Sequence, residues 1–190
     1  MLAKPEKYIE AGARISADGK YRYRLWREWR GTHDHNNWRW LGGNDGAGQP
    51  IGQPKSCVFV MLNPSTADGE KDDPTIRRCV GFAKRWNFER LEVVNLFAYR
   101  ATKPKVIFDL LASGGDPIGW QNSEIVGEVA TDAGLIVCAW GAHGDLGEQD
   151  EIMRGWLLPL PCFALGFTKD GHPRHPLYAP ADSALVPMPL

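Results

Sequence analysis

The chain has 190 residues, of which 43% are hydrophobic, and a formal net charge of −1. That length suits one domain with a sizeable core, and that composition excludes a disordered chain and a membrane-embedded one. A balanced charge also gives no overall electrostatic argument for nucleic-acid binding, although it leaves local basic patches open.

The first 55 residues are expected to supply edge strands and a loop. Residues 1–12 predict a lead-in, with a short helix as one alternative, and carry charge where a signal peptide needs an apolar core. In residues 21–25, tyrosine and leucine alternate with arginine, as is typical of a half-buried antiparallel edge strand. Residues 31–55 are rich in Gly, Asn and Gln and predict a long loop or hairpin insertion. Because the four cysteines are widely spaced, without a CxxC pair, we expect a cytoplasmic protein.

The rest of the chain is organised around residues 58–68, VFVMLNPSTAD. The uncharged apolar run 58–62 predicts a strand buried on both faces. This strand must end at Pro64, which has no N–H to give to a sheet. A buried parallel strand that ends in a polar turn places the turn where open α/β folds bind ligands. A turn merely capped by Asn63 and Ser65 is the alternative.

Helices and strands alternate downstream of this strand. Further strands are predicted over residues 91–98, 135–140 and 162–167, and helices over 74–86, 106–112, 119–131 and 147–158. This alternation favours a mostly parallel sheet covered by helices on both faces. We therefore predict one domain over residues 1–190, a three-layer α/β sandwich with four core strands and N-terminal antiparallel edge strands.

Polar side chains follow all four core strands, and right-handed crossovers bring these strand ends to one edge of the sheet. The candidates for binding a ligand there are Pro64, Ser65, Thr66, Asn95, Phe97, Tyr99, Arg100, His143, Lys169, His172 and Arg174. Asn95 is costly to bury inside a strand, so it either pairs with backbone or reaches a ligand. Phe97 and Tyr99 suit a stacking wall, with core packing as the alternative for Phe97. Arg100 is a candidate for binding a phosphate, with a position on a solvated face as the alternative.

Three side chains at this edge are the candidates for chemistry: Asn63, Asp68 and His175. Asn63 offers a donor and an acceptor on a rigid base and can hold a water or a base edge. Asp68 is a candidate general base, with capping as its ordinary role. A histidine stabilises developing negative charge or moves a proton, and the sequence leaves open whether His172 or His175 faces the cleft. Prolines beside both histidines disfavour a helical metal pair, so we expect no metal and no cofactor.

Two resemblances follow from these motifs. MLNPSTAD, DPTIRRC, VVNLFAYRAT, DPIGWQN, AWGAHG and GFTKDGHPRHPLY resemble a bacterial and phage family known as a domain of unknown function, over nearly the whole chain. The order of the strand-end motifs is also similar to the uracil-DNA glycosylase superfamily. That similarity implies its fold, with Asn63 positioning a water and His175 supporting the leaving base. It also implies that Asn95 reads a flipped base stacked on Phe97.

The leading interpretation is a nucleobase- or nucleotide-binding protein of uracil-DNA-glycosylase-like fold, with hydrolysis of an N-glycosidic bond in DNA as its reaction. Met61 and Ser65 stand where that superfamily has glycines, which favours a second interpretation, a non-catalytic nucleotide- or nucleic-acid-binding module. The third is an enzyme that acts on a free nucleotide or another small ligand. In each the expected partner is a nucleobase, a nucleotide or DNA and not a membrane, and the oligomeric state stays open.

Overall fold

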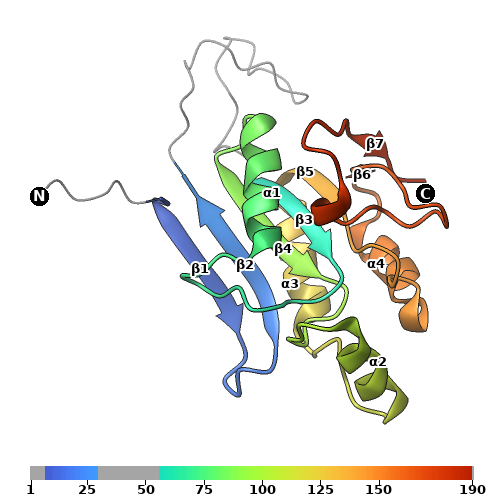
Figure 1. Cartoon of the computed structure of the whole chain (residues 1–190). Coiled ribbons are helices and arrows are strands. Elements are labelled where there is room, and N and C mark those ends of the chain that lie inside the picture. Colours follow the sequence, from blue (N-terminus) through green and yellow to red (C-terminus); the bar gives the residue numbers. More distant parts are fainter. Residues whose placement is uncertain (1–6, 30–55, 190) are drawn as a thin grey trace, which may run out of the picture.

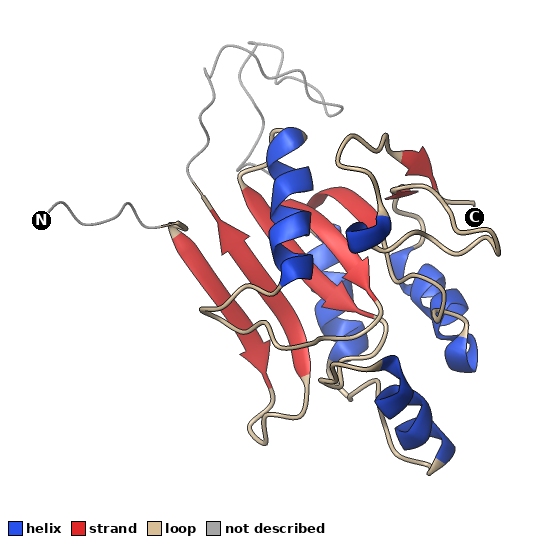
Figure 2. Cartoon of the chain, in the orientation of Figure 1, coloured by secondary structure: helices blue, strands red, loops and turns tan. Residues whose placement is uncertain are grey.

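The computed structural model describes residues 7–29 and 56–189. Figure 1 shows a sheet with α1 on one face and α3 and α4 on the other, and Figure 2 separates the strands from the helices by colour. The three-layer α/β arrangement predicted from the sequence is therefore confirmed. The predicted 31–55 insertion lies outside the described residues.

Within the described residues the sheet has seven strands in the order β1-β2-β4-β3-β5-β6-β7. They are β1 (Glu10–Ile15), β2 (Arg22–Glu28), β3 (Ser56–Met61), β4 (Arg90–Asn95), β5 (Ala133–Cys138), β6 (Cys162–Ala164) and β7 (Val186–Pro187). The four neighbours β4, β3, β5 and β6 pair in parallel, as the sequence predicted for the core strands. The outer strands β1, β2 and β7 pair antiparallel.

The helices follow the predicted alternation. They are α1 (Pro74–Arg85), α2 (Pro104–Ala112), α3 (Asn122–Thr131) and α4 (Gln149–Leu157), with 3₁₀ turns η1 (Leu146–Glu148) and η2 (Pro176–Tyr178). The start of α1 is the best-defined boundary, because the Asp73 carboxylate accepts a hydrogen bond from the Ile76 N–H at 2.9 Å. Pro74 then occupies the first helical position, where its missing N–H costs nothing.

One N-terminal expectation is corrected. Glu10–Ile15 forms β1, where a short helix was one alternative for residues 1–12. The strand pairs antiparallel with β2, and Gly12 lies against the Trp26 ring so closely that a Cβ there would be 2.2 Å from it. Pairing with the edge of β2 therefore makes Glu10–Ile15 a strand. This is a tertiary effect, which local sequence propensity does not predict.

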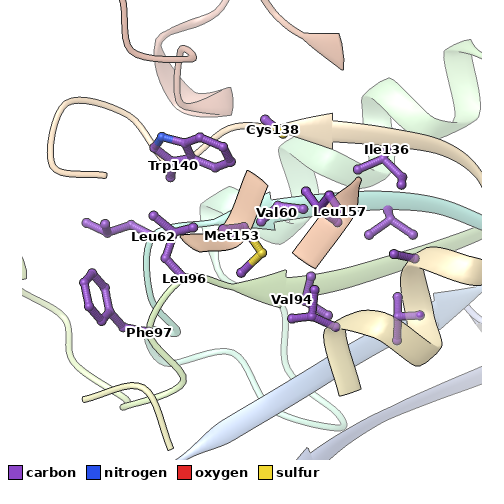
Figure 3. Packing of buried hydrophobic residues seen from close by; sticks show 14 of the residues in the cluster. Val60, Leu62, Val94, Leu96, Phe97, Ile136, Cys138, Trp140, Met153 and Leu157 are labelled. Atoms are coloured by element: carbon purple, nitrogen blue, oxygen red, sulfur yellow. The ribbon is translucent and has the colours of Figure 1, made fainter. Parts of the chain in front are cut away.

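The core consists of two apolar layers, one on each face of β3, whose six residues are all buried. Val58 and Val60 belong to the layer that includes side chains of α3 and α4, and Figure 3 shows Val60 packed there with Met153 and Leu157. Cys57 and Phe59 belong to the layer under α1. No helix in the described part of the chain is both long and apolar enough to cross a bilayer. The four cysteines are free, and three of them are buried.

Candidate functional site

The carboxyl ends of the four parallel strands lie at one edge of the sheet. From β3 the chain passes through α1 to β4 on one side, and from β4 it passes through α2 and α3 to β5 on the other side of β3. Such a reversal is a topological switch point, and open α/β sheets bind ligands outside the carboxyl ends of the strands at that point. The turns that leave this point begin near Asn63 after β3 and near Gly141 after β5.

Asn63 joins the turn after β3 to the turn after β4. Its Nδ2 donates to the Ala101 carbonyl at 2.7 Å and to the Pro64 carbonyl at 3.1 Å. The Ala101 N–H donates to the same Pro64 carbonyl at 2.9 Å, which closes the link between the two turns. Because Nδ2 is committed to two carbonyls, Oδ1 is the atom of this amide that is left to accept a hydrogen bond from a water or a ligand.

His175 lies on the β5 side of β3, beside Gly141, in the segment where η2 packs against α1. Arg78 of α1 donates to the Pro176 carbonyl at 3.2 Å, and a Cβ placed on Gly141 would lie 3.5 Å from the His175 Cβ. The His175 Nδ1 accepts the Leu177 N–H at 3.3 Å, so Nε2 carries the proton of the neutral ring. Burial lowers the pKa of His175, against the opposing effect of the Asp73 carboxylate. At neutral pH this side chain is therefore a neutral hydrogen-bond donor.

The lowered pKa of His175 predicts a pH-dependent stability. Its folded-state pKa lies below the ordinary 6.5, so between the two values the unfolded chain binds more protons. The stabilising effect is complete above pH 6.5 and is lost as the pH falls below it. Between about pH 7.5 and about pH 5.5 the wild type should lose up to about 1.4 kcal/mol of unfolding free energy through this group, and His175→Asn should not.

Urea denaturation at the two pH values measures this difference. His143→Asn, at an exposed histidine, is the matched control and should show the wild-type loss. An equal loss in the wild type and in His175→Asn would contradict the expected burial of a neutral ring.

An open depression of about 440 Å³ lies between the turns after β3 and β4 and the start of α2. It is lined by Ser65, Thr66, Tyr99, Arg100, Ala101, Thr102 and Val106. The Tyr99 ring meets the Tyr21 ring edge-on, with the ring centroids 5.5 Å apart, so the residue that precedes β2 supports this wall. The depression therefore combines an aromatic wall, hydroxyl groups and a guanidinium, and its volume is in the range of small-molecule sites.

Two of the predicted site residues are engaged in the fold itself. Phe97 is buried in the core on the α3 face and is not among the residues that line the depression. The Asp68 carboxylate accepts the N–H groups of Glu70 at 2.9 Å and Lys71 at 2.8 Å. These hydrogen bonds lower the pKa of Asp68, so it caps a turn and is a weak general base.

Four other candidates lie on the turns after β5 and β6, apart from the depression. His143 is exposed, and its ring meets the Phe108 ring at 5.2 Å between centroids. Lys169 is also exposed. His172 is tied through its backbone N–H to the Thr168 hydroxyl. Arg174 donates to the Phe167 carbonyl at 2.9 Å, which holds the turn after β6 closed.

Sequence reasoning missed one residue near this site, Arg22. Its side chain is only 2% exposed, and its Nη1 donates to the Ala67 carbonyl at 2.9 Å. The alternating pattern of residues 21–25 predicts that this arginine faces solvent. Arg14 pairs with Arg24 and Ile15 pairs with Arg22, so Tyr23 is an extra residue in β2, and this irregularity, which the sequence does not signal, interrupts the alternation beside Arg22.

Asn95 is buried at 1% exposure, and neither its Nδ2 nor its Oδ1 has a hydrogen-bond partner within residues 7–29 and 56–189. The neighbouring Asn122 donates to the backbone carbonyls of Asn95 and Leu96 instead, at 2.9 and 3.1 Å. The sequence left two alternatives for Asn95, pairing with backbone or reaching a ligand. Within the described residues its side chain does not pair with backbone.

A family model described as a protein of unknown function matches residues 22–177. The match begins at the first residue of β2 and ends inside η2, so it includes Asn63, the depression and His175. The comparison with curated proteins gave no match, and neither did the comparison with solved structures.

Proposed function

We propose that this chain, which belongs to the DUF1643 family of proteins of unknown function, binds a nucleotide across the carboxyl edge of its sheet and hydrolyses the N-glycosidic bond. The sugar is held beside Asn63, and the base extends toward His175. The observation that carries this function is the anchoring of Asn63, because two backbone carbonyls hold its Nδ2 and leave Oδ1 to orient a water.

Hydrolysis of an N-glycosidic bond needs a water aimed at C1′ of the sugar and a donor for the departing base. Asn63 Oδ1 accepts a hydrogen bond from that water. As the bond from C1′ to the base nitrogen breaks, the base leaves with the electron pair and the Nε2–H of His175 donates to it. The water oxygen bonds to C1′, and the proton that it releases passes to the base through solvent.

The resemblance of Asn63-Pro64 and His175-Pro176 to the uracil-DNA glycosylase motifs supports the same two roles. The positions of the two residues agree with this division of labour, since Asn63 follows β3 and His175 lies beside the end of β5. The neutral state of the His175 ring also suits a donor to a base anion.

Base release is the direct assay. Substrates are uracil, hypoxanthine and modified pyrimidines in single- and double-stranded DNA, together with the corresponding free nucleotides. Asn63→Ala and His175→Ala should each lower the rate by roughly 10²-fold or more. Glu124→Gln, at an exposed position on α3, is the control and should keep the wild-type rate. Folded wild-type protein that releases no base from any of these substrates would overturn the hydrolase.

A second candidate function is a non-catalytic nucleotide-binding module, and the state of Asp68 favours it. The carboxylate that could have activated a water is tied to two backbone N–H groups instead. Nucleoside binding by the wild type that persists in the Asn63→Ala/His175→Ala double variant, with no turnover in the wild type, would establish this function.

A further inference from the structure

Two arginines of β2 are buried beneath the loop that joins β3 to α1, and their partners differ. In Figure 1 this loop crosses in front of β2 on the α1 face. Arg27 is 0% exposed, and it donates to the Asp72 carboxylate at 2.8 Å and to the Asp68 carbonyl at 2.6 Å. Arg22 donates to the Ala67 carbonyl, but no carboxylate of the described residues lies within 4.0 Å of it, and its Nε has no partner among them.

Arg100, on the turn after β4, repeats the pattern of Arg22. It lines the depression and donates to the Gly19 carbonyl at 3.2 Å. Its Nε is buried without a partner in the described part of the chain, where no carboxylate lies within 4.0 Å of it either. Burial lowers the pKa of Arg22 to about 10, and the charge of Arg100 adds to this effect. Arg22 is therefore charged at neutral pH, and the positive charge of Arg100 repels it.

Two carboxylates lie near Arg22, but neither contacts it. The carboxylates of Asp68 and Asp73 act on Arg22 through space, from beyond 4.0 Å, and they offset part of its charge. A buried cation without a contacting counter-charge costs several kcal/mol. An anion bound at Arg100 would offset part of this cost through space, whereas Asp72 offsets the charge of Arg27 by direct contact.

Asn95 adds an amide on the same face of the sheet. Leu91 and Val93 of β4 belong to the apolar layer under α1, so by alternation Asn95 points to that face. Arg22 also leaves β2 on that face, because its partner Ala67 belongs to the same layer. Strands β2 and β4 are hydrogen-bonded neighbours. An unpartnered buried amide costs free energy, but Asn95 is not among the residues that line the depression.

We infer that Arg100 and Arg22 form an oxyanion subsite on the β2 side of the depression, and that it takes the phosphate group of the bound nucleotide. This inference rests on the proposed function for the rest of the ligand. Arg100 contacts the phosphate at the depression, and the charge of Arg22 acts on it through space from beneath the turn that contains Ala67. Guanidinium groups pair with phosphate oxygens in a bidentate geometry, and the hydroxyls of Ser65 and Thr66 supply further donors.

Calorimetric titration of the full chain tests this subsite with four probes: inorganic phosphate, a nucleoside, its 5′-monophosphate and a short single-stranded oligonucleotide. The monophosphate should bind the wild type roughly tenfold or more tightly than the nucleoside. In Arg22→Met and in Arg100→Met this advantage should fall to roughly threefold or less, with the nucleoside affinity unchanged. Arg85→Met, at an exposed position at the end of α1, is the matched control and should keep the advantage.

The outcomes separate this inference from the function on which it rests. A nucleoside and its monophosphate that bind equally would overturn the phosphate subsite and leave nucleoside binding intact. Phosphate binding that depends on Arg22 and Arg100, without any nucleoside binding, would establish the subsite and overturn the proposed function. Where the oligonucleotide binds more tightly than the monophosphate and weakens steeply with salt, the phosphate belongs to a nucleic-acid backbone. Otherwise it belongs to a free nucleotide.

Discussion

Asp72→Ala is expected to lower the free energy of unfolding by about 3–5 kcal/mol. The Asp72 side chain is 5% exposed and accepts hydrogen bonds from Arg27 at 2.8 Å, from the Tyr8 hydroxyl at 2.6 Å and from Lys7. Its removal leaves the guanidinium of Arg27 buried without a counter-charge. Urea denaturation at neutral pH measures the change.

The double variant Arg27→Met/Asp72→Ala is the informative control. It removes the stranded charge together with its partner, so it should be less destabilised than Asp72→Ala alone. A loss below about 1 kcal/mol in Asp72→Ala would mean that the pair contributes no more than an exposed ion pair.

Phe59→Ala should cost about 3–5 kcal/mol of unfolding free energy. Phe59 is 0% exposed in the middle of β3, and its ring centroid lies 6.5 Å from that of Phe82 on α1 and 6.2 Å from that of Trp86, the residue that caps the end of α1. Alanine would leave a cavity between the central strand and the helix whose first turn is capped by Asp73. Thermal and urea denaturation measure the loss.

Phe59→Leu is the matched comparison, because it keeps most of the apolar volume. It should cost about half as much as the alanine variant or less. Equal losses in the two variants would show that α1 does not depend on the aromatic contact, and the cavity explanation would be withdrawn.

The central sheet could be predicted because its signals are local. The apolar run 58–62 is followed closely by Pro64, and Asp73 followed by Pro74 marks the start of α1, so each boundary depends on residues that lie close together in the chain. The ends of strands are less local. The predicted strand 91–98 is assigned only as far as Asn95 in β4, although Phe97 still donates to the Leu62 carbonyl at 2.9 Å.

The candidate site could be predicted only in part, because its defining contacts join distant residues. The sequence indicates that Asn63 begins a polar turn, but not that the carbonyl of Ala101 holds its amide. The alternating pattern predicts that Arg22 faces solvent, because it does not contain the pairing with β1 that makes Tyr23 an extra residue. The Asn95 side chain is buried without a hydrogen-bond partner in the described structure. That property depends on the tertiary packing around it, which a local sequence pattern does not predict.

The two outer strands of the sheet carry different protections against edge-to-edge aggregation. On one side β1 has charged residues at Glu10 and Arg14 and an irregular register at its end, features that discourage an added strand. On the other side β7 is two residues long and ends in Pro187, which has no amide hydrogen to offer to a further strand. Within the described residues, both margins of the sheet therefore carry features that disfavour β-augmentation.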